Sequence, residues 1–417
     1  MTQIINHCHS GSLKDKAGKT ELDDILRSHI NDYQLHYKLH PEHYKVVADI
    51  LECRTSFLGG HIHKCSDCKT EKNMYNSCRN RHCPKCQTMT KARWLEARKA
   101  ELLPVQYFHS VFTLPHEINP VALCNKRVVY GILFKAVSET LLQFGKNPKN
   151  GLEGKLGVIS ILHTWDQKMN THLHLHCVIS GGVLSFDNTT FNECGKDFLF
   201  PVMALSKVFR GKFMELFSKA FDEERLTFPG RISLLGTPNG FKTLVNKLWK
   251  KNWVVYTKKP FSGPDDVLGY IARYTHRVAI SNNRILNCQN GKTTFTYRNR
   301  KTDIIESETL ESVEFIRRFL LHVIPKNFMR IRHYGLFAKR NKTKNVNLCR
   351  KLLGYNATLP KPVEKNINEL MLELTGKDIT LCPFCKKGTM EKVSEIPKLT
   401  GVSAYEIIKR IKIRGST

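Results

Sequence analysis

The chain has 417 residues, enough for two or three domains, and 41% of them are apolar, which supplies material for hydrophobic cores. The chain has 66 lysine and arginine residues and 37 acidic residues, which gives a formal net charge of +29. This charge argues against an enzyme that acts on small acidic metabolites, and it favours a polyanion such as nucleic acid as the partner. The sequence shows no pattern of a secretion signal or of a membrane span, so we expect the protein to reside in a reducing cytoplasm. In that environment paired cysteines bind metal rather than form disulfides.

The predicted elements begin after a flexible tail, residues 1–20. Apolar residues at helical spacing predict a helix over 22–52. A cysteine-rich block at 65–86 follows, and then a helix rich in arginine, lysine and alanine over 88–103. We expect these elements to form a zinc-binding, DNA-binding N-terminal domain over 21–103, with the character of a zinc ribbon next to helices.

The cysteine-rich block contains two C-x-x-C pairs with fourteen residues between them. Four thiolates in such pairs are typical of a tetrahedral zinc site that stabilises a small domain without a large core. The predicted zinc ligands are Cys65, Cys68, Cys83 and Cys86.

Other residues of this block leave the ligand set open. Cys78, His82 and His63 are alternatives for one of the four ligands. Arg79 and Arg81 lie between the two pairs, and we predict that they contact DNA phosphates.

The next region, residues 104–289, has the pattern of an α+β domain with a central antiparallel sheet flanked by helices. Its expected strands span 107–114, 156–165, 172–180 and 253–257. Its expected helices span 120–144, 205–222, 241–250 and 264–276. The polar stretch 166–171 predicts a hairpin, and Gly181-Gly182 predicts a turn after its second strand.

Three histidines alternate in the second strand of this hairpin. Side chains two residues apart on a strand share one face, so His172, His174 and His176 point the same way, and the intervening apolar residues face a core. Imidazole is the commonest ligand for divalent metals. The pattern therefore favours a metal site that uses His174 and His176.

A third ligand is required for such a site. The side-chain carbonyl of Gln167, across the hairpin, is the preferred candidate, and His172, Asp166 and His163 are its rivals. Two imidazoles and one oxygen suit Mg²⁺ or Mn²⁺, with positions left open for phosphate oxygens.

Two tyrosines stand four residues apart in the expected helix over 264–276. Tyr270 and Tyr274 would therefore lie on one helical face, with Arg273 and Arg277 on a neighbouring strip. A phenol can attack phosphorus, while arginine and a divalent metal offset the charge that develops on the phosphate. This pattern predicts a nucleophile pair beside two DNA-binding arginines.

The remaining region, 290–417, is basic and carries a further C-x-x-C pair. A strand is expected over 293–298 and a helix over 313–323. Cys382 and Cys385 make only half a metal site, to which Cys349 or a partner would contribute, and a free buried pair is the alternative.

Together these stretches resemble the HUH endonucleases, in which two histidines flank a bulky apolar residue. His174-Leu175-His176 matches that motif, Phe112-Thr113-Leu114 resembles the first rolling-circle motif, and Tyr270 with Tyr274 resembles the third. Over about residues 20–340 the chain is more closely similar to the insertion-sequence-91 family of transposases. The longer matching phrases run over 77–86, 163–167 and 273–281.

The resemblance implies rolling-circle-like transposition. One tyrosine would nick single-stranded DNA at an element end and form a 5′-phosphotyrosine, and the other would act on the target or on the second end. Host helicase and replication machinery would assist, because the sequence has no P-loop for a helicase of its own. The implied location is the bacterial cytoplasm, at the nucleoid.

Two other functions remain as alternatives. One is a zinc-dependent, sequence-specific DNA-binding protein without catalysis, and the other is an HUH endonuclease of the replication-initiator or relaxase type. A tyrosine recombinase is disfavoured, since the histidine strand would have no role in its chemistry.

Overall fold

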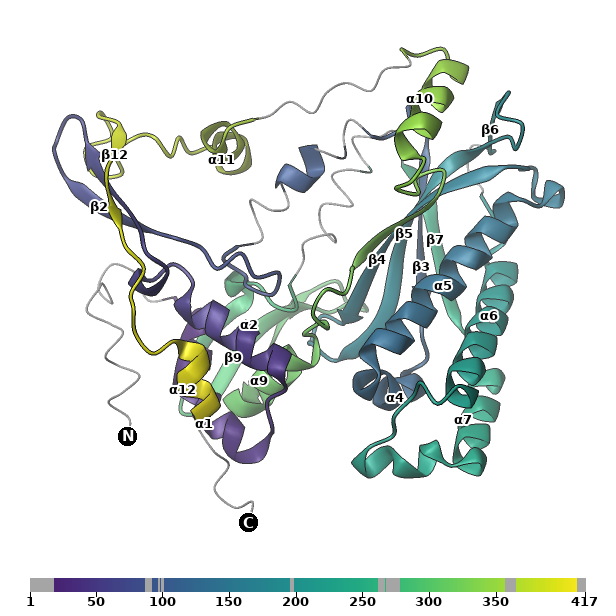
Figure 1. Ribbon diagram of the computed structural model, residues 1–417, viewed down its shortest axis with the longest axis horizontal. Helices are drawn as coiled ribbons and strands as arrows, with labels where there is room; N and C mark the ends of the chain where they lie inside the picture. Colours follow the sequence, from purple (N-terminus) through teal and green to yellow (C-terminus); the bar gives the residue numbers. More distant parts are fainter. Residues whose placement is uncertain are drawn as a thin grey trace.

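The computed structural model describes residues 19–86, 92–96, 98, 101–195, 199–261, 267, 278–356 and 365–410. Within these ranges the chain forms three antiparallel sheets with helices around them, which confirms the α+β class (Figure 1). No helix of the described residues is long and apolar enough to cross a membrane.

The largest sheet has the strand order β11-β4-β5-β3-β7, and the short strand β6 also pairs with β5. Its strands are β3 (Tyr107–Thr113), β4 (Lys155–Trp165), β5 (Thr171–Leu184), β6 (Phe191–Glu193), β7 (Val254–Phe261) and β11 (Ile331–Gly335). All neighbours are antiparallel. The predicted strands are confirmed, and the histidine strand β5 lies between β4 and β3, at the centre of the sheet.

One face of this sheet is covered by helices (Figure 1). These are α4 (Asn119–Cys124), α5 (Lys126–Gly145), α6 (Val202–Asp222) and α7 (Pro238–Lys250). Phe112, Leu173 and Leu175 point to this side and belong to the largest buried apolar cluster. The alternate residues, among them the histidines, therefore face the opposite side.

Two predicted helices are each divided in the structure. The helix expected over 22–52 is α1 (Leu22–His36) and α2 (Pro41–Glu52), because Pro41 lacks the N–H that a helix interior needs. The helix expected over 120–144 is interrupted at Asn125, whose side chain bonds to the backbone of Thr227 over 2.7 Å both as donor and as acceptor. In both cases the predicted helical class is confirmed.

The turn predicted at Gly181-Gly182 is wrong, because β5 continues through both glycines to Leu184. A Cβ on Gly181 would lie 2.6 Å from a side-chain atom of Gln106, and one on Gly182 would lie 2.5 Å from the ring of Phe191. These glycines allow neighbouring segments to approach the strand closely, which is a common role of glycine inside a sheet.

The other two sheets lie beside the N-terminal helices. One has the order β12-β1-β2 and the other β10-β9-β8. Their strands are β1 (Gly60–Cys65), β2 (Glu71–Tyr75), β8 (Ile285–Gln289), β9 (Lys292–Arg298), β10 (Ile305–Glu311) and β12 (Met390–Ile396). The strand expected over 293–298 is thus confirmed as β9.

The helix expected over 313–323 is confirmed as α9 (Ser312–Leu321), which packs against α1. The further helices are α10 (Lys342–Leu352), α11 (Ile367–Thr375) and α12 (Ala404–Arg410), and short 3₁₀ helices span Ser56–Leu58, His116–Ile118, Pro148–Asn150, Gly230–Gly236 and Asn282–Arg284. A second buried cluster joins α1, α2 and α9 to Trp165 and Met169, at the end of the β4–β5 hairpin.

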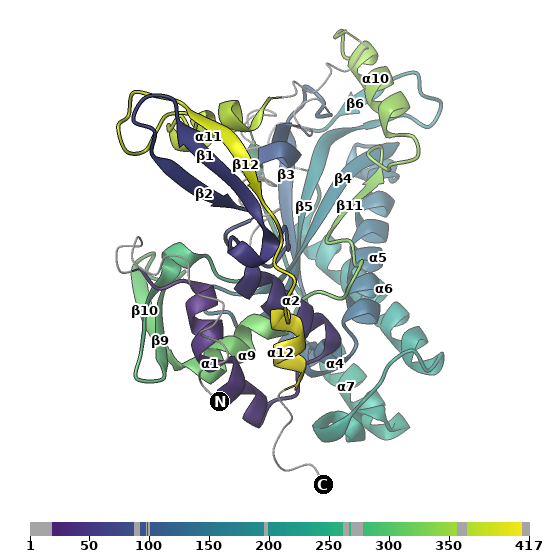
Figure 2. The same ribbon diagram turned by 60° about the vertical axis from the view of Figure 1, so that its left-hand side comes forward.

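The C-terminal part of the chain returns to the N-terminal helices. Strand β12 lies beside β1, and α12 lies beside α1 and α2 (Figure 2). The backbone N–H of Ala404 donates to the Glu52 carboxylate over 2.6 Å, and the Gln34 amide donates to the carbonyl of Ile408 over 3.0 Å. Segments more than 350 residues apart therefore share one structural unit.

Gly335, at the end of β11, is a sensitive position for stability. Its φ is +57°, and a Cβ there would lie 1.9 Å from the carbonyl oxygen of Leu156. We expect Gly335→Ala to lower the free energy of unfolding by at least about 2 kcal/mol, measured by urea denaturation. Gly131→Ala in α5 is the control, because no atom lies within 4 Å of the added methyl. It should change stability by less than about 1 kcal/mol, towards greater stability.

Candidate active site

Three histidines from two neighbouring strands converge on the face of the large sheet opposite the helices α4–α7. His163 in β4 pairs directly with His174 in β5, and His176 lies two residues further along β5. One ring nitrogen of each lies within 4.8 Å of the others, and the Nε2 atoms of His174 and His176 are 3.2 Å apart. We call His163, His174 and His176 the histidine cluster, and its geometry suits one bound divalent cation.

The protonation state of these histidines also suits metal binding. They are 3%, 4% and 8% exposed in chain order, so burial lowers the pKa of His174 to about 3 and that of His176 below its usual range. At neutral pH both rings are therefore neutral, which is the form that binds metal. The Nδ1–H of His174 donates to the carbonyl of His172 over 2.9 Å, which leaves the Nε2 lone pair available.

The third ligand indicated by this geometry is His163, one of the rivals in the sequence analysis. Gln167 lies beyond the strand ends, in the hairpin turn, where its backbone carbonyl accepts a hydrogen bond from Arg284. His172 stays outside the cluster, although its ring is 4.8 Å from that of His174. The chemistry of the set is then three imidazoles rather than two imidazoles and an amide.

His109 in β3 is a site residue that the sequence analysis missed. Its Nε2 lies 2.9 Å from Nδ1 of His176, so the His176 Nδ1–H can donate to it and leave Nε2 for the metal. Burial lowers the pKa of His109 to about 3, which keeps it a neutral acceptor. Only the register of β3 against β5 brings these rings together, and that register is not apparent from a single strand.

Removing this support should weaken metal binding. We expect His109→Ala to raise the dissociation constant for Mn²⁺ about 10- to 100-fold, because second-shell partners of ligating histidines typically have effects of this size. Isothermal titration with Mn²⁺ measures the change. His333→Ala is the matched control, since His333 is a partly buried histidine on the neighbouring strand β11. An equal loss in the control would show that packing, not orientation of His176, causes the effect.

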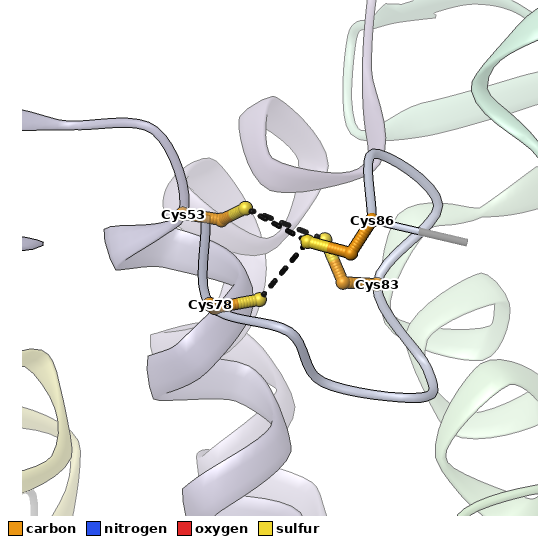
Figure 3. Close-up of side chains that lie close together, drawn as sticks. All are labelled: Cys53, Cys78, Cys83 and Cys86. Carbon is orange, nitrogen blue, oxygen red and sulfur yellow. Dashed lines mark hydrogen bonds between the residues drawn. The ribbon is translucent and has the colours of Figure 1, made fainter. Parts of the chain in front are cut away.

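The predicted zinc cysteines do not form one site. The structure places Cys83 and Cys86 with Cys53 and Cys78, and we call these four the Cys53 cluster (Figure 3). Cys65 and Cys68 lie instead with Cys382 and Cys385, the Cys382 cluster. The predicted grouping is therefore wrong. The β1–β2 hairpin carries its pair towards β12, whereas the loop after β2 folds back onto the end of α2.

The Cys53 cluster has the geometry of a tetrahedral thiolate site. Its sulfur–sulfur distances are 3.4 Å for Cys53–Cys86, 3.6 Å for Cys53–Cys83 and 3.6 Å for Cys78–Cys86. Four sulfurs about 2.3 Å from one zinc ion would lie about 3.8 Å apart, whereas a disulfide would need about 2.05 Å. A backbone N–H also points at a sulfur, from Asn80 to Cys78 over 3.5 Å. Sequence reasoning missed Cys53, which belongs to no C-x-x-C pair.

The two predicted DNA-binding arginines of this region are both exposed, in the loop that carries the Cys53 cluster. Arg81 donates to the carbonyl of Phe328 over 2.8 Å, which ties the loop to the segment before β11. Arg79 has a left-handed backbone with φ of 54°.

Tyr270, Tyr274, Arg273 and Arg277 lie outside the described residues. Val267 and Ile280, described residues on either side of them, are both buried. Val267 belongs to the buried cluster that contains Ile161 of β4, next but one to His163. Ile280 belongs to the cluster that contains Trp165, which stacks on the ring of His163.

A further positive charge lies near the histidines. The Arg300 guanidinium, in the turn between β9 and β10, contributes to the low pKa values of His172, His174 and His176. Its side chain is exposed. Arg300 can therefore meet an anionic group that approaches the cluster, and nothing in its local sequence would have identified it.

The chain is similar to known transposases over most of its length. Residues 157–345 match a family model described as "Putative transposase", and residues 25–114 match one described as "Transposase zinc-binding domain". A "Putative transposase y4qJ" of Sinorhizobium fredii is 42% identical over 385 residues, which cover 91% of this chain and 96% of the relative. The "Transposase for insertion sequence element IS801" of Pseudomonas savastanoi pv. phaseolicola is 27% identical over 306 residues, or 71% of this chain and 70% of that protein. No solved structure matches the chain.

Each family model covers one of the candidate metal sites. The zinc-binding model spans all of the Cys53 cluster, which supports zinc as a metal of this protein, and the transposase model spans the histidine cluster. Together with the relatives, these matches show that the chain belongs to the insertion-sequence-91 family of transposases.

Proposed function

We propose that this transposase nicks and rejoins single-stranded DNA through a 5′-phosphotyrosine intermediate, during rolling-circle-like transposition of its element. The substrates would be the element ends and the target DNA. Unwinding would come from host helicase and replication proteins.

The histidine cluster is the observation that carries this proposal. Three neutral imidazoles on rigid neighbouring strands would hold Mg²⁺ or Mn²⁺ with positions left for phosphate oxygens. The bound cation would polarise the scissile phosphate and offset the charge that develops on it. Arg300 adds a positive charge on the same side. Such a site serves phosphodiester chemistry better than it serves binding alone.

The proposed nucleophiles are Tyr270 and Tyr274. The phenolic oxygen of one loses its proton to water and attacks phosphorus, the bond between phosphorus and the 3′-oxygen breaks, and the 3′-oxygen takes up a proton from water as it leaves. Rejoining reverses these steps when a 3′-hydroxyl attacks the phosphotyrosine. The assignment of these two residues as nucleophiles is supported by the spacing of Tyr270 and Tyr274, which resembles the third rolling-circle motif.

The test is cleavage of labelled single-stranded DNA from the element ends in the presence of Mn²⁺. The wild-type chain should form a covalent protein–DNA adduct, and the Tyr270→Phe/Tyr274→Phe double variant should form none, since phenylalanine has no attacking oxygen. Tyr256→Phe is the control, because Tyr256 is an exposed tyrosine of β7. It should form the adduct at the wild-type rate.

Each single tyrosine variant adds information about the division of labour. Loss of adduct at only one element end would assign that tyrosine to that end. An adduct that persists in the double variant would refute the proposed nucleophiles. DNA binding without any cleavage by the wild-type chain would favour a DNA-binding protein without catalysis.

A further inference from the structure

The geometry points to a second structural zinc ion, bound by Cys65, Cys68, Cys382 and Cys385, which joins the N-terminal β1–β2 hairpin to the C-terminal strand β12. The matched zinc-binding domain ends at residue 114, so it contains only half of these ligands. This inference is independent of the proposed nicking reaction.

The sulfur positions fit one tetrahedral ion. Cys65 and Cys385 lie 3.7 Å apart at Sγ, Cys68 and Cys382 also lie 3.7 Å apart, and all four sulfurs are within 4.8 Å of one another. The separation expected around one zinc ion is about 3.8 Å. These distances are too long for a disulfide, in which the sulfurs are about 2.05 Å apart.

The two halves of the Cys382 cluster share two backbone features. In each, the residue after the second cysteine is left-handed, with φ of 59° at Lys69 and 58° at Lys386. In each, a backbone N–H also points at a sulfur, from Asp67 to Cys65 over 3.4 Å and from Gly388 to Cys385 over 3.5 Å. Such turns direct amide hydrogens to thiolates and stabilise their charge. The two separate segments thus share a left-handed residue directly after their second cysteine, and each directs an amide hydrogen at one of its sulfurs.

Close approach of the two halves depends on Gly388. A Cβ at this position would lie 2.6 Å from Sγ of Cys65 and 2.7 Å from the backbone nitrogen of Asp67. The backbone of Thr389 accepts a hydrogen bond from Ser66 N–H over 2.9 Å at the same place. A free pair of buried cysteines would not need so tight a contact between the two turns.

The surrounding sheet has little apolar core to hold it together. Four of the five residues of β2 are exposed, as are five of the seven in β12. A module this small and this exposed usually needs a metal or a disulfide to be stable. A zinc ion bound by both ends would supply that stability.

The experiment counts thiolate-bound metal in the full chain. His174→Ala and His176→Ala are present throughout, so that the histidine cluster takes up no ion, and Co²⁺ replaces zinc. The sulfur-to-cobalt charge-transfer band should saturate at two equivalents of Co²⁺. With Cys382→Ser and Cys385→Ser it should saturate at one, with about half the absorbance, because a tetrathiolate site needs all four ligands.

Controls separate ligand loss from other causes. Cys124→Ser/Cys194→Ser removes two cysteines that belong to neither cluster and should leave two equivalents. Cys385→His should keep two equivalents but shift the cobalt d–d bands, because an imidazole replaces one thiolate. This variant also decides the matter if the double-serine variant misfolds and loses both ions.

Three results would overturn the inference. The first is saturation of the parent chain at one equivalent. The second is two equivalents in the double-serine variant, or unchanged bands in Cys385→His. The third is the finding, by mass spectrometry of the non-reduced protein, that Cys65 or Cys68 is disulfide-bonded to Cys382 or Cys385.

Discussion

Replacing His174 or His176 with alanine should reduce the rate of single-strand DNA nicking about 100- to 1,000-fold, the effect expected when the electrostatic stabilisation of a phosphoryl transition state is lost. The Nε2 atoms of the two side chains lie 3.2 Å apart, close enough for both to bind the same cation. Each alanine variant leaves at most two of the three imidazoles, which would hold the cation weakly and in the wrong geometry.

The measurement is single-turnover cleavage of labelled element-end DNA at saturating Mn²⁺. His172→Ala is the matched control, because His172 lies on the same strand and outside the cluster, and its backbone carbonyl still accepts the His174 hydrogen bond. It should keep the rate within about threefold of wild type, since it removes no ligand. A comparable loss in His172→Ala, or nicking by His174→Ala at the wild-type rate, would contradict the assigned ligand set.

The central sheet and its histidine strand were predictable because their signals are local. Alternation of apolar and imidazole side chains has a period of two, and that period alone places the apolar set on one face of the sheet and the imidazoles on the other. Predicting this strand did not require knowing its neighbours in the sheet. The structure confirms it as β5, with its apolar residues in the largest buried cluster. The same reasoning identified β3, β4 and β7.

The grouping of the cysteines was not predictable in this way. Spacing along the chain favoured one site built from the two N-terminal pairs, but Cys53 and Cys382 lie on segments whose proximity to those pairs depends on the tertiary fold. His163 and His109 show the same limitation, because only the register of three strands sets which ring meets which. A single sequence defines side-chain faces, and it leaves register and long-range pairing undetermined.

Replacing Cys53 with serine should release the ion of the Cys53 cluster and destabilise the N-terminal helices. Cys53, Cys83 and Cys86 belong to the buried cluster that joins these helices to the end of the β4–β5 hairpin, at Trp165 and Met169. Structural zinc typically contributes about 10 kcal/mol or more to the folding of small zinc domains. Loss of even about 2 kcal/mol should lower the melting temperature of such a unit by about 10 °C.

To test this expectation, metal content and thermal unfolding are measured on the same preparations. Cys124→Ser is the control, because Cys124 is exposed and belongs to neither cluster. The result also discriminates between the two groupings of the cysteines. If Cys65, Cys68, Cys83 and Cys86 shared one ion, Cys53 would be a spectator and Cys53→Ser would keep the full metal content. If the structure's grouping holds, Cys53→Ser loses one thiolate-bound ion and the Cys382 cluster keeps its own, because the two sites have no ligand in common.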